Sequence, residues 1–238
     1  MTIFTSYLNE AGDIVAISSN GTVQYHNNNA DGYWDIDRAV NYNHSVIYTA
    51  TREFDTRQKC QPVDNQDYCI QQSIERLNLT TGSVTQVYSR VDPRYENSEW
   101  HDTFQINSSH FVVADMYADE IFIVNVTSGS VIYEWSLQSY LSLNSGGQYP
   151  DDWGHINDVE VLDKGWIMVS VRNHDQVLFI NPHSGVMSNW TLGADDNHDI
   201  LYEQHNPDYI PTKRGGPAVL VADSENNRIV EYQRSAGG

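Results

Sequence analysis

Three of the nine histidines recur at one place in a repeated sequence pattern. His101, His155 and His205 each stand just before a run of strand-forming residues, at spacings of 54 and 50 residues. An imidazole titrates near neutral pH, so it can act as a nucleophile or as a general base. We predict that the three imidazoles converge, because equivalent positions of units repeated around one axis face that axis.

An arginine accompanies the histidines. When the repeats are aligned on Asp119 and Asp175, Arg172 falls where the sibling repeats carry the uncharged Met116 and Ser224. A residue that departs from a local rule often marks a functional position. The planar donors of a guanidinium match the oxygens of sulfate, phosphate or carboxylate. The sequence therefore predicts an oxyanion site that holds a candidate covalent histidine.

Two other interpretations of the histidines are open. Three histidines can form a zinc site, although a guanidinium pointing into the same site would repel a dication. Polar residues on inner propeller strands can also be structural and bond the neighbouring repeat. We expect the remaining histidines to be solvated, in loops or at strand edges: His26, His44, His110, His174, His183 and His198.

The elements that would position these residues are strands. Residues 111–135 and 166–190 share one order of apolar runs, a turn, a Ser-Gly turn and a tryptophan, and residues 219–232 begin the same order again. The Ser-Gly or Thr-Gly turns recur at Gly82, Gly129 and Gly185, at intervals of 47 and 56 residues. Such a period is typical of four-stranded β-propeller blades. A β-sandwich is the alternative, but a sandwich does not repeat a four-strand unit.

We therefore predict an all-β fold, a single β-propeller domain over residues 1–238 with few and short helices. Five blades are visible, and the fifth stops before its outer strands, so we expect a further blade beyond the C-terminus. The predicted blades are residues 10–40, 43–90, 101–137, 155–192 and 205–234.

The charge excludes one class of partner. Asp and Glu number 32 against 13 Lys and Arg, which gives a formal net charge of -19 and leaves no basic cluster for a nucleic acid. No apolar stretch is long enough to span a membrane. Many aspartates with only three lysines favour a halophilic protein whose carboxylates keep it soluble in strong salt.

The cysteines and the sequons favour export. Cys60 and Cys69 are nine positions apart in a polar stretch, a spacing that suits a local disulfide. No signal peptide is visible at Met1, so we expect an extracellular or cell-surface protein whose targeting segment has been removed, or a piece of a longer chain. Six Asn-X-Ser/Thr sequons are candidate glycosylation sites, at Asn20, Asn43, Asn78, Asn107, Asn125 and Asn189.

Residues 100–232 contain four motifs: DWGHIND at 152–158, VSVRN at 169–173, QH at 204–205 and ADSENNR at 222–228. Through these motifs, this segment resembles the arylsulfotransferase family. The segment YWDID at 33–37 and the acidic composition look more like the haloarchaeal branch. The family is a six-bladed propeller that transfers sulfate between phenols without a nucleotide donor.

The resemblance implies a role for each matched residue. His205 would be the nucleophile that becomes a sulfohistidine, and His101, His155, Asn157 and Arg172 would bind the sulfuryl oxygens. The reaction would be ping-pong, from an aryl sulfate to a phenol as acceptor. The resemblance implies no metal and no adenylyl-sulfate cofactor.

Two further functions stay open at this stage. The chain can be a non-catalytic extracellular propeller that binds a ligand or contacts other surface proteins. It can also be a metal-dependent hydrolase or lyase on the same fold, in which the three histidines bind the metal.

Overall fold

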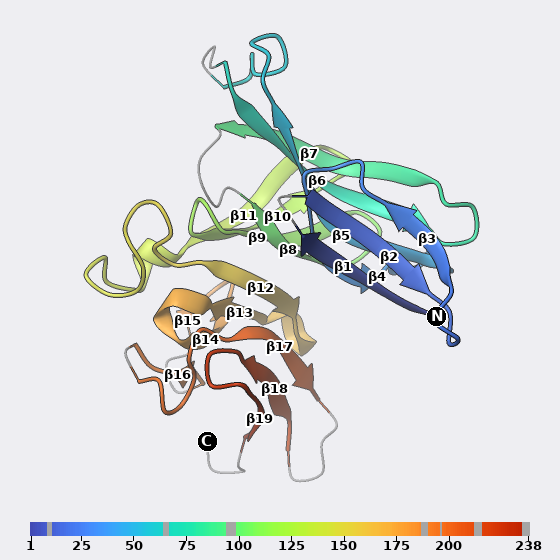
Figure 1. Ribbon diagram of the computed structural model, residues 1–238. Helices are drawn as coiled ribbons and strands as arrows, with labels where there is room; N and C mark the ends of the chain where they lie inside the picture. Colours follow the sequence, from blue (N-terminus) through green and yellow to red (C-terminus); the bar gives the residue numbers. More distant parts are fainter. Residues whose placement is uncertain are drawn as a thin grey trace. The chain divides into compact units, whose positions relative to one another are not determined.

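A computed structural model describes residues 1–8, 11–63, 67–93, 99–186, 190–195, 197–211 and 216–234. The described chain is built of strands in five antiparallel sheets (Figure 1). Its contacts group into two compact units: unit 1 is Met1–Val113 with Ile123–Ile132, and unit 2 is Ala114–Phe122 with Tyr133–Gly238. The described part contains no helix with the length and apolar character that a membrane span requires.

The first two sheets lie in unit 1. The first has the order β1-β2-β3, made of β1 (Thr2–Leu8), β2 (Ala11–Ile17) and β3 (Val23–Asn27). The second has the order β4-β5-β6-β7, made of β4 (Gly32–Arg38), β5 (Ser45–Phe54), β6 (Cys69–Asn78) and β7 (Val84–Pro93). This corrects the first two predicted blades. The prediction placed 32–38 with the first blade, whereas β4 pairs with β5, and β1 lies partly before residue 10.

Each of the other three sheets overlaps one predicted blade. The third is β8 (Trp100–Gln105), β9 (His110–Asp115), β10 (Glu120–Asn125) and β11 (Ser130–Ser136). The fourth is β12 (Ile156–Val161), β13 (Ile167–Val171), β14 (Gln176–Asn181), β15 (Gly185–Val186) and β16 (Leu192–Gly193). The fifth is β17 (His205–Ile210), β18 (Ala218–Asp223) and β19 (Arg228–Gln233). The helices of the described residues are the short 3-10 turns η1 (Leu137–Ser139), η2 (Asp163–Gly165) and η3 (Arg172–His174).

The hydrophobic pattern follows the place of each strand in its sheet. The second strand β13 is buried at every position, and β9 at all but the first, and both sequences are mostly apolar. The last strand β11 alternates between exposed and partly buried residues, as expected where one face meets solvent. The first strands lie side by side within each unit: β1 contacts β4 and β4 contacts β8, and β12 contacts β17.

One turn repeats in three sheets. Asp119, Asp175 and Asn227 each directly precede the third strand and have left-handed φ values of 50°, 53° and 53°. Asn and Asp tolerate this conformation better than other non-glycine residues. The alignment of Asp119 with Asp175 made from the sequence therefore corresponds to one shared backbone turn.

Unit 1 packs around a buried polar group. Tyr33 and Tyr48 meet edge to face at 5.5 Å in a core with apolar residues of β2, β5 and β6. The Tyr48 hydroxyl donates to Glu75 at 3.1 Å, and Arg52 pairs with the same carboxylate at 2.6 Å. The hydroxyl of Thr49 donates to the carbonyl of Trp100 at 2.5 Å, which connects β5 to β8.

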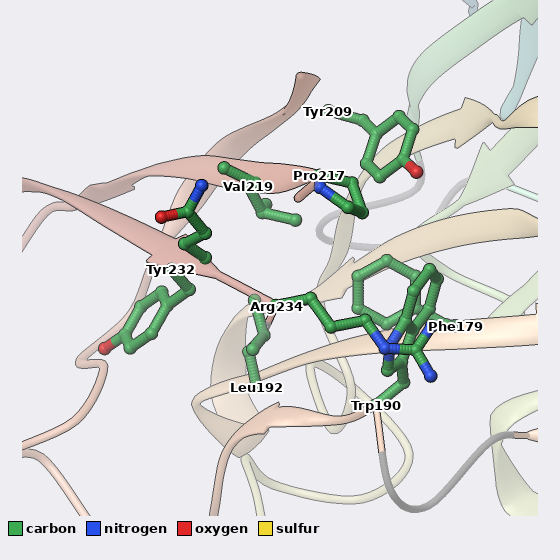
Figure 2. A pocket seen from close by; sticks show the side chains of 10 residues that line it. Phe179, Trp190, Leu192, Tyr209, Pro217, Val219, Tyr232 and Arg234 are labelled. Carbon is green, nitrogen blue, oxygen red and sulfur yellow. The ribbon is translucent and has the colours of Figure 1, made fainter. Parts of the chain in front are cut away.

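Unit 2 packs the fourth sheet against the fifth. Met168, Val177 and Phe179 form one core with Val219 and Val221. Partly buried aromatic residues continue this core on one side, where they line a pocket (Figure 2). These aromatic residues are Trp190, Tyr209 and Tyr232.

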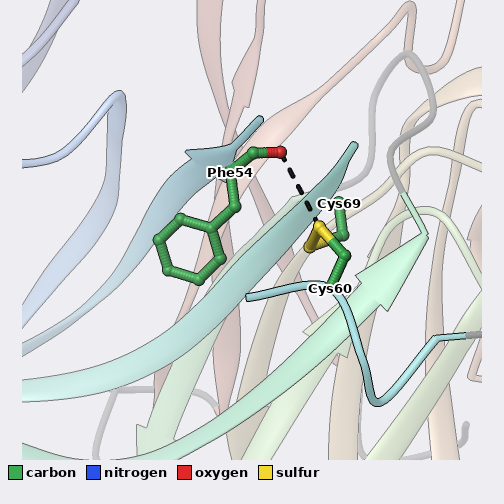
Figure 3. Close-up of a disulfide and its surroundings, with 3 residues drawn as sticks. All are labelled: Phe54, Cys60 and Cys69. Carbon is green, nitrogen blue, oxygen red and sulfur yellow. Dashed lines mark hydrogen bonds between the residues drawn. A yellow bond between two sulfur atoms is a disulfide. The ribbon is translucent and has the colours of Figure 1, made fainter. Parts of the chain in front are cut away.

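A disulfide joins Cys60 to Cys69, as the sequence predicted (Figure 3). Both cysteines are fully buried and their Cα atoms are 5.5 Å apart. Cys69 is the first residue of β6, and the Cys60 Sγ lies 3.8 Å from the carbonyl oxygen of Phe54, the last residue of β5. The bond therefore closes the long connection between two paired strands.

Removing this bond should destabilise unit 1. The double variant C60A/C69A loses a cross-link over a sequence separation of 9 residues, which in the unfolded chain restricts a short loop. We expect the free energy of unfolding to fall by about 2–3 kcal/mol, measured by urea denaturation. Wild type denatured under reducing conditions should match the variant. Equal stability of the variant and the oxidised wild type would contradict the prediction.

Candidate functional site

Three of the four predicted basic residues lie in unit 2, where β12, β13 and β17 meet. His155 directly precedes β12, Arg172 begins η3 after β13, and His205 begins β17. The backbone N–H of Arg172 donates to the carbonyl of His155 at 3.1 Å. Since β12 also contacts β17, the structure brings His155, Arg172 and His205 into one neighbourhood.

The backbone at both histidines departs from a regular strand. His155 has a left-handed φ of 51°, and the register of β12 shifts between Ile156 and Asp158. The register of β17 shifts in the same way between His205 and Asp208. Bulges of this kind change the direction of a side chain and are frequent next to active sites. Left-handed non-glycine residues likewise occur at functional positions more often than elsewhere.

The residue before His155 has to be glycine. The N–H of Gly154 donates to the Asp119 carboxylate at 2.9 Å, and a Cβ on Gly154 would collide with that carboxylate and with Leu137. Burial raises the pKa of Asp119. The hydrogen bond from Gly154 lowers it, but burial is the larger effect and the pKa is about 7. The turn between β9 and β10 thus anchors the loop that carries His155.

A carboxylate holds His155. Its Nδ1 lies 2.8 Å from the Asp152 Oδ1, so that Nε2 is the ring nitrogen directed away from this carboxylate. Burial alone would raise the pKa of Asp152. The hydrogen bond and the charge of His155, together with the charge of Arg172, outweigh burial and hold that pKa below its usual range.

A second carboxylate holds Arg172. One Nη donates to the Glu203 carboxylate, and the other donates to the Asn173 side chain at 2.8 Å. The N–H of Glu203 in turn donates to Asp175 at 2.8 Å, and burial raises the pKa of that aspartate. A guanidinium has five N–H donors, so these contacts orient Arg172 and leave donors for a ligand.

The environment keeps His205 neutral. Burial lowers the pKa of His205 to about 4, and the positive charges of Arg172 and His155 lower it further in the same direction. A neutral imidazole has a free electron pair on one ring nitrogen, which is the form that can attack an electrophile. The cluster therefore combines a candidate nucleophile with an arginine and a second histidine near it.

Several buried polar contacts hold Gln204, the residue before His205. Gln204 is fully buried, and its side-chain nitrogen lies within hydrogen-bond distance of Ser170, Val171 and Gln176 at 2.9–3.1 Å. The amide nitrogen of Asn157 donates to the Gln204 carbonyl at 2.9 Å. Asn157 is only 3% exposed, so this contact attaches β12 to the start of β17. Its predicted role in substrate binding stays a prediction.

The fourth predicted residue, His101, is the second residue of β8 in unit 1. Its ring packs on the indole of Trp34 with centroids 5.0 Å apart. Its role in a shared site stays a prediction. Within the described ranges, no group of three His, Cys, Asp or Glu side chains is arranged to hold a metal ion.

A pocket of about 410 Å³ lies beside the cluster in unit 2. The pocket is polar. Its lining includes Arg172 and the carboxylates of Asp152 and Glu203, which contact His155 and Arg172. The stacked rings of His198 and Tyr202, with centroids 4.0 Å apart, also line it. Its lining residues are Gly146, Gly147, Asp152, Arg172, Asn173, Asp175, His198, Tyr202 and Glu203.

Sequence reasoning missed Glu203, although a signal for it exists. A glutamate stands two residues before two of the three histidines, as Glu99 before His101 and as Glu203 before His205. It also missed the burial of His174, which was predicted to be solvated. His174 is 1% exposed, its Nδ1 lies 2.7 Å from Asp195, and its ring meets Trp153 edge to face. Residues from loops on both sides of the ring bury His174. Contacts between loops leave no periodic pattern in the sequence.

Comparisons with known proteins bear on the fold. No family model and no curated protein matches the sequence. Solved structures do match: a protein of unknown function from Bacteroides caccae has 12% identity and a TM-score of 0.58, over 97% of this chain and 73% of that chain. A candidate 6-phosphogluconolactonase from Bacteroides fragilis has 11% identity and a TM-score of 0.59, over 99% and 64%. A protein from Lactobacillus plantarum has 10% identity and a TM-score of 0.51, over 97% and 65%.

These likenesses show the fold and not the activity, because the identities are 10–12%. The predicted fold class is confirmed: the chain is an all-β propeller, with five antiparallel sheets in the residues that the structure describes. The chain spans 64–73% of the length of these structures.

The charge environment of His205 gives a test by titration. We expect NMR of the wild type to show protonation of the His205 imidazole only near pH 4. The variant R172Q removes one nearby positive charge, so the pKa of His205 should rise toward 6.5. Between pH 6.5 and 4 the unfolded chain binds a proton that the folded chain does not, so this group lowers stability as the pH falls through that window.

The control is R76Q, which removes an arginine from unit 1 and should leave the pKa of His205 unchanged. A wild-type His205 that titrates near 6.5, or one that does not respond to R172Q, would contradict this account of the cluster.

Proposed function

We propose that this protein is an arylsulfotransferase-like enzyme that moves a sulfuryl group from an aryl sulfate to a phenol through His205, without a nucleotide donor. The observation that carries the proposal is the neutral His205 imidazole beside the two basic groups Arg172 and His155. These three residues also stand in the motifs that resemble the arylsulfotransferase family.

The first half-reaction would form a covalent histidine. The free electron pair of the His205 ring attacks sulfur, the nitrogen–sulfur bond forms, and the sulfur–oxygen bond to the phenol breaks. The phenolate leaves and takes up a proton. In the second half-reaction the oxygen of another phenol attacks the same sulfur and loses its proton. The nitrogen–sulfur bond breaks and its electron pair returns to the ring nitrogen, which restores His205.

The neighbouring cations suit this transfer. Negative charge on the sulfuryl oxygens and on the leaving phenolate changes during each step, and fixed donors stabilise it in the transition state. Arg172 supplies donors that its contacts with Glu203 and Asn173 leave over. His155 supplies its Nε2 because Asp152 occupies the other ring nitrogen. His101 and Asn157 remain proposed ligands of the sulfuryl oxygens, on the resemblance alone.

The proposal includes a setting. We propose a single propeller domain in an exported, halophilic and archaeal protein that carries glycans at exposed sequons such as Asn20 and Asn43. The buried Cys60–Cys69 bond and the charge of -19 support such an origin. The substrates are small molecules, with contacts to other surface proteins as the alternative.

The first test is a transfer assay with p-nitrophenyl sulfate as donor and phenol as acceptor. We expect release of nitrophenol that depends on phenol. H205A should reduce the rate at least about 10³-fold and R172Q about 10²-fold. The matched control H26A replaces a half-exposed histidine that pairs with Asp13 in unit 1, and it should leave the rate unchanged.

A second readout detects the intermediate. Incubation with the donor but without acceptor should add the mass of one SO₃ group to the wild type and to H26A, and none to H205A. A wild type that neither gains this mass nor releases nitrophenol would refute the enzyme and favour a non-catalytic propeller.

A further inference from the structure

A second pocket lies in unit 2 between the fourth and fifth sheets, and it shares no residue with the site of His205. Its volume is about 210 Å³, and most of its lining is apolar. The lining comes from β14, β16, β17, β18 and β19, and Figure 2 shows the side chains grouped around one space. The four aromatic residues in it are Phe179, Trp190, Tyr209 and Tyr232.

The pocket carries one cation on an aromatic face. Arg234 follows β19, and its guanidinium lies 4.1 Å from the centroid of the Trp190 ring. The view in Figure 2 shows its side chain crossing from the end of β19 to Trp190 and Phe179. Phe179 packs on the same indole edge to face, with centroids 4.6 Å apart. Stacking on Trp190 holds the guanidinium in place beside the pocket.

The guanidinium of Arg234 makes no hydrogen bond or ion pair with another described residue, although its backbone N–H donates to the carbonyl of Pro217 at 2.9 Å. Several other arginines pair with carboxylates: Arg52 with Glu75, Arg90 with Asp92 and Arg228 with Asp223. Among the described residues, no carboxylate pairs with Arg234, in a protein that holds 32 Asp and Glu against 13 Lys and Arg.

The indole of Trp190 adds a second donor. Its Nε1 is buried and has no hydrogen-bond partner among the residues that the structure describes. A buried donor without a partner costs free energy that a ligand acceptor would recover. Glu160, a nearby carboxylate, is engaged elsewhere, since it accepts from the backbone N–H of Tyr209 at 3.0 Å.

We propose that this pocket binds a single-ring aromatic anion, an arenecarboxylate or an arenesulfonate. The aromatic walls would take the ring, and Arg234 would bind the anionic group. The volume suits this class, because a cavity of about 150 Å³ lined by apolar side chains is enough for benzene. The proposal does not rest on the function proposed for His205.

The test uses benzenesulfonate, whose sulfur is bonded to carbon and so cannot be transferred as a sulfuryl ester. We expect it to bind the wild type in a calorimetric titration, and R234Q to weaken binding about tenfold or more, because the charge-assisted contact is lost. R234K, which keeps the charge, should retain more of the affinity. The neutral analogue benzamide should bind wild type and R234Q equally.

The matched control is R76Q. Arg76 also lies on an aromatic ring, that of Tyr42 at 3.8 Å, but in unit 1 and outside this pocket. R76Q should bind benzenesulfonate like the wild type. H205A should too, which separates this site from the proposed enzyme site.

A second measurement locates the ligand. The ¹⁵N–¹H signal of the Trp190 indole, assigned by its loss in Trp190→Phe, should shift when benzenesulfonate is added. The proposal is overturned if benzenesulfonate does not bind, if this signal does not move, or if affinity is unchanged in R234Q. It is also overturned if affinity is lost in H205A, because the anion would then occupy the other site.

Discussion

The compensation of positive charge by carboxylates is the constraint on which the site depends. Burial, together with the nearby charges of Arg172 and His155, holds the His205 imidazole neutral, and like charges repel one another in a partly buried place. Asp152 holds His155 at 2.8 Å, and Glu203 holds Arg172. These two contacts fix the side chains of His155 and Arg172. The Nε2 of His155 and the remaining guanidinium N–H groups of Arg172 point away from the two carboxylates. A net charge of -19 therefore coexists with a local group of basic side chains.

The fold supplies this arrangement through a few buried polar contacts. Gln204 reaches the fourth sheet from the start of β17, and Asn157 reaches back to its carbonyl. Asp119 holds the loop of His155 from the preceding turn. The contacts of Gln204 and Asn157 join strands next to the basic residues of the cluster, and the contact of Asp119 holds the loop of His155, so the distances within the cluster depend on the packing of sheets and not on one loop. The geometry of the cluster therefore depends on how adjacent blades pack together.

Much of this could be predicted from the sequence, and the reason lies in the repeat. The turns at Asp119, Asp175 and Asn227 recur because the chain reverses direction at the same point in each of these sheets. Residues that align in the sequence therefore occupy equivalent positions in the structure. The proximity of His155, Arg172 and His205 was predicted in this way, and their role in a site stays a prediction. The first blade was misplaced because the strands before residue 40 lack the Ser-Gly turn signal. Glu203 and the buried His174 were missed because their partners come from other loops, and single-sequence periodicity does not record such contacts.

The central claim is that these basic residues form an anion site around a neutral His205. A crystal structure of the protein soaked with tungstate, a tetrahedral oxyanion visible by anomalous scattering, tests it most directly. The account predicts an anomalous peak within hydrogen-bond distance of Arg172 and of the Nε2 of His155, next to the His205 ring. A map in which the ion avoids these residues, while Arg172 and His155 keep only their contacts with Glu203 and Asp152, would contradict it.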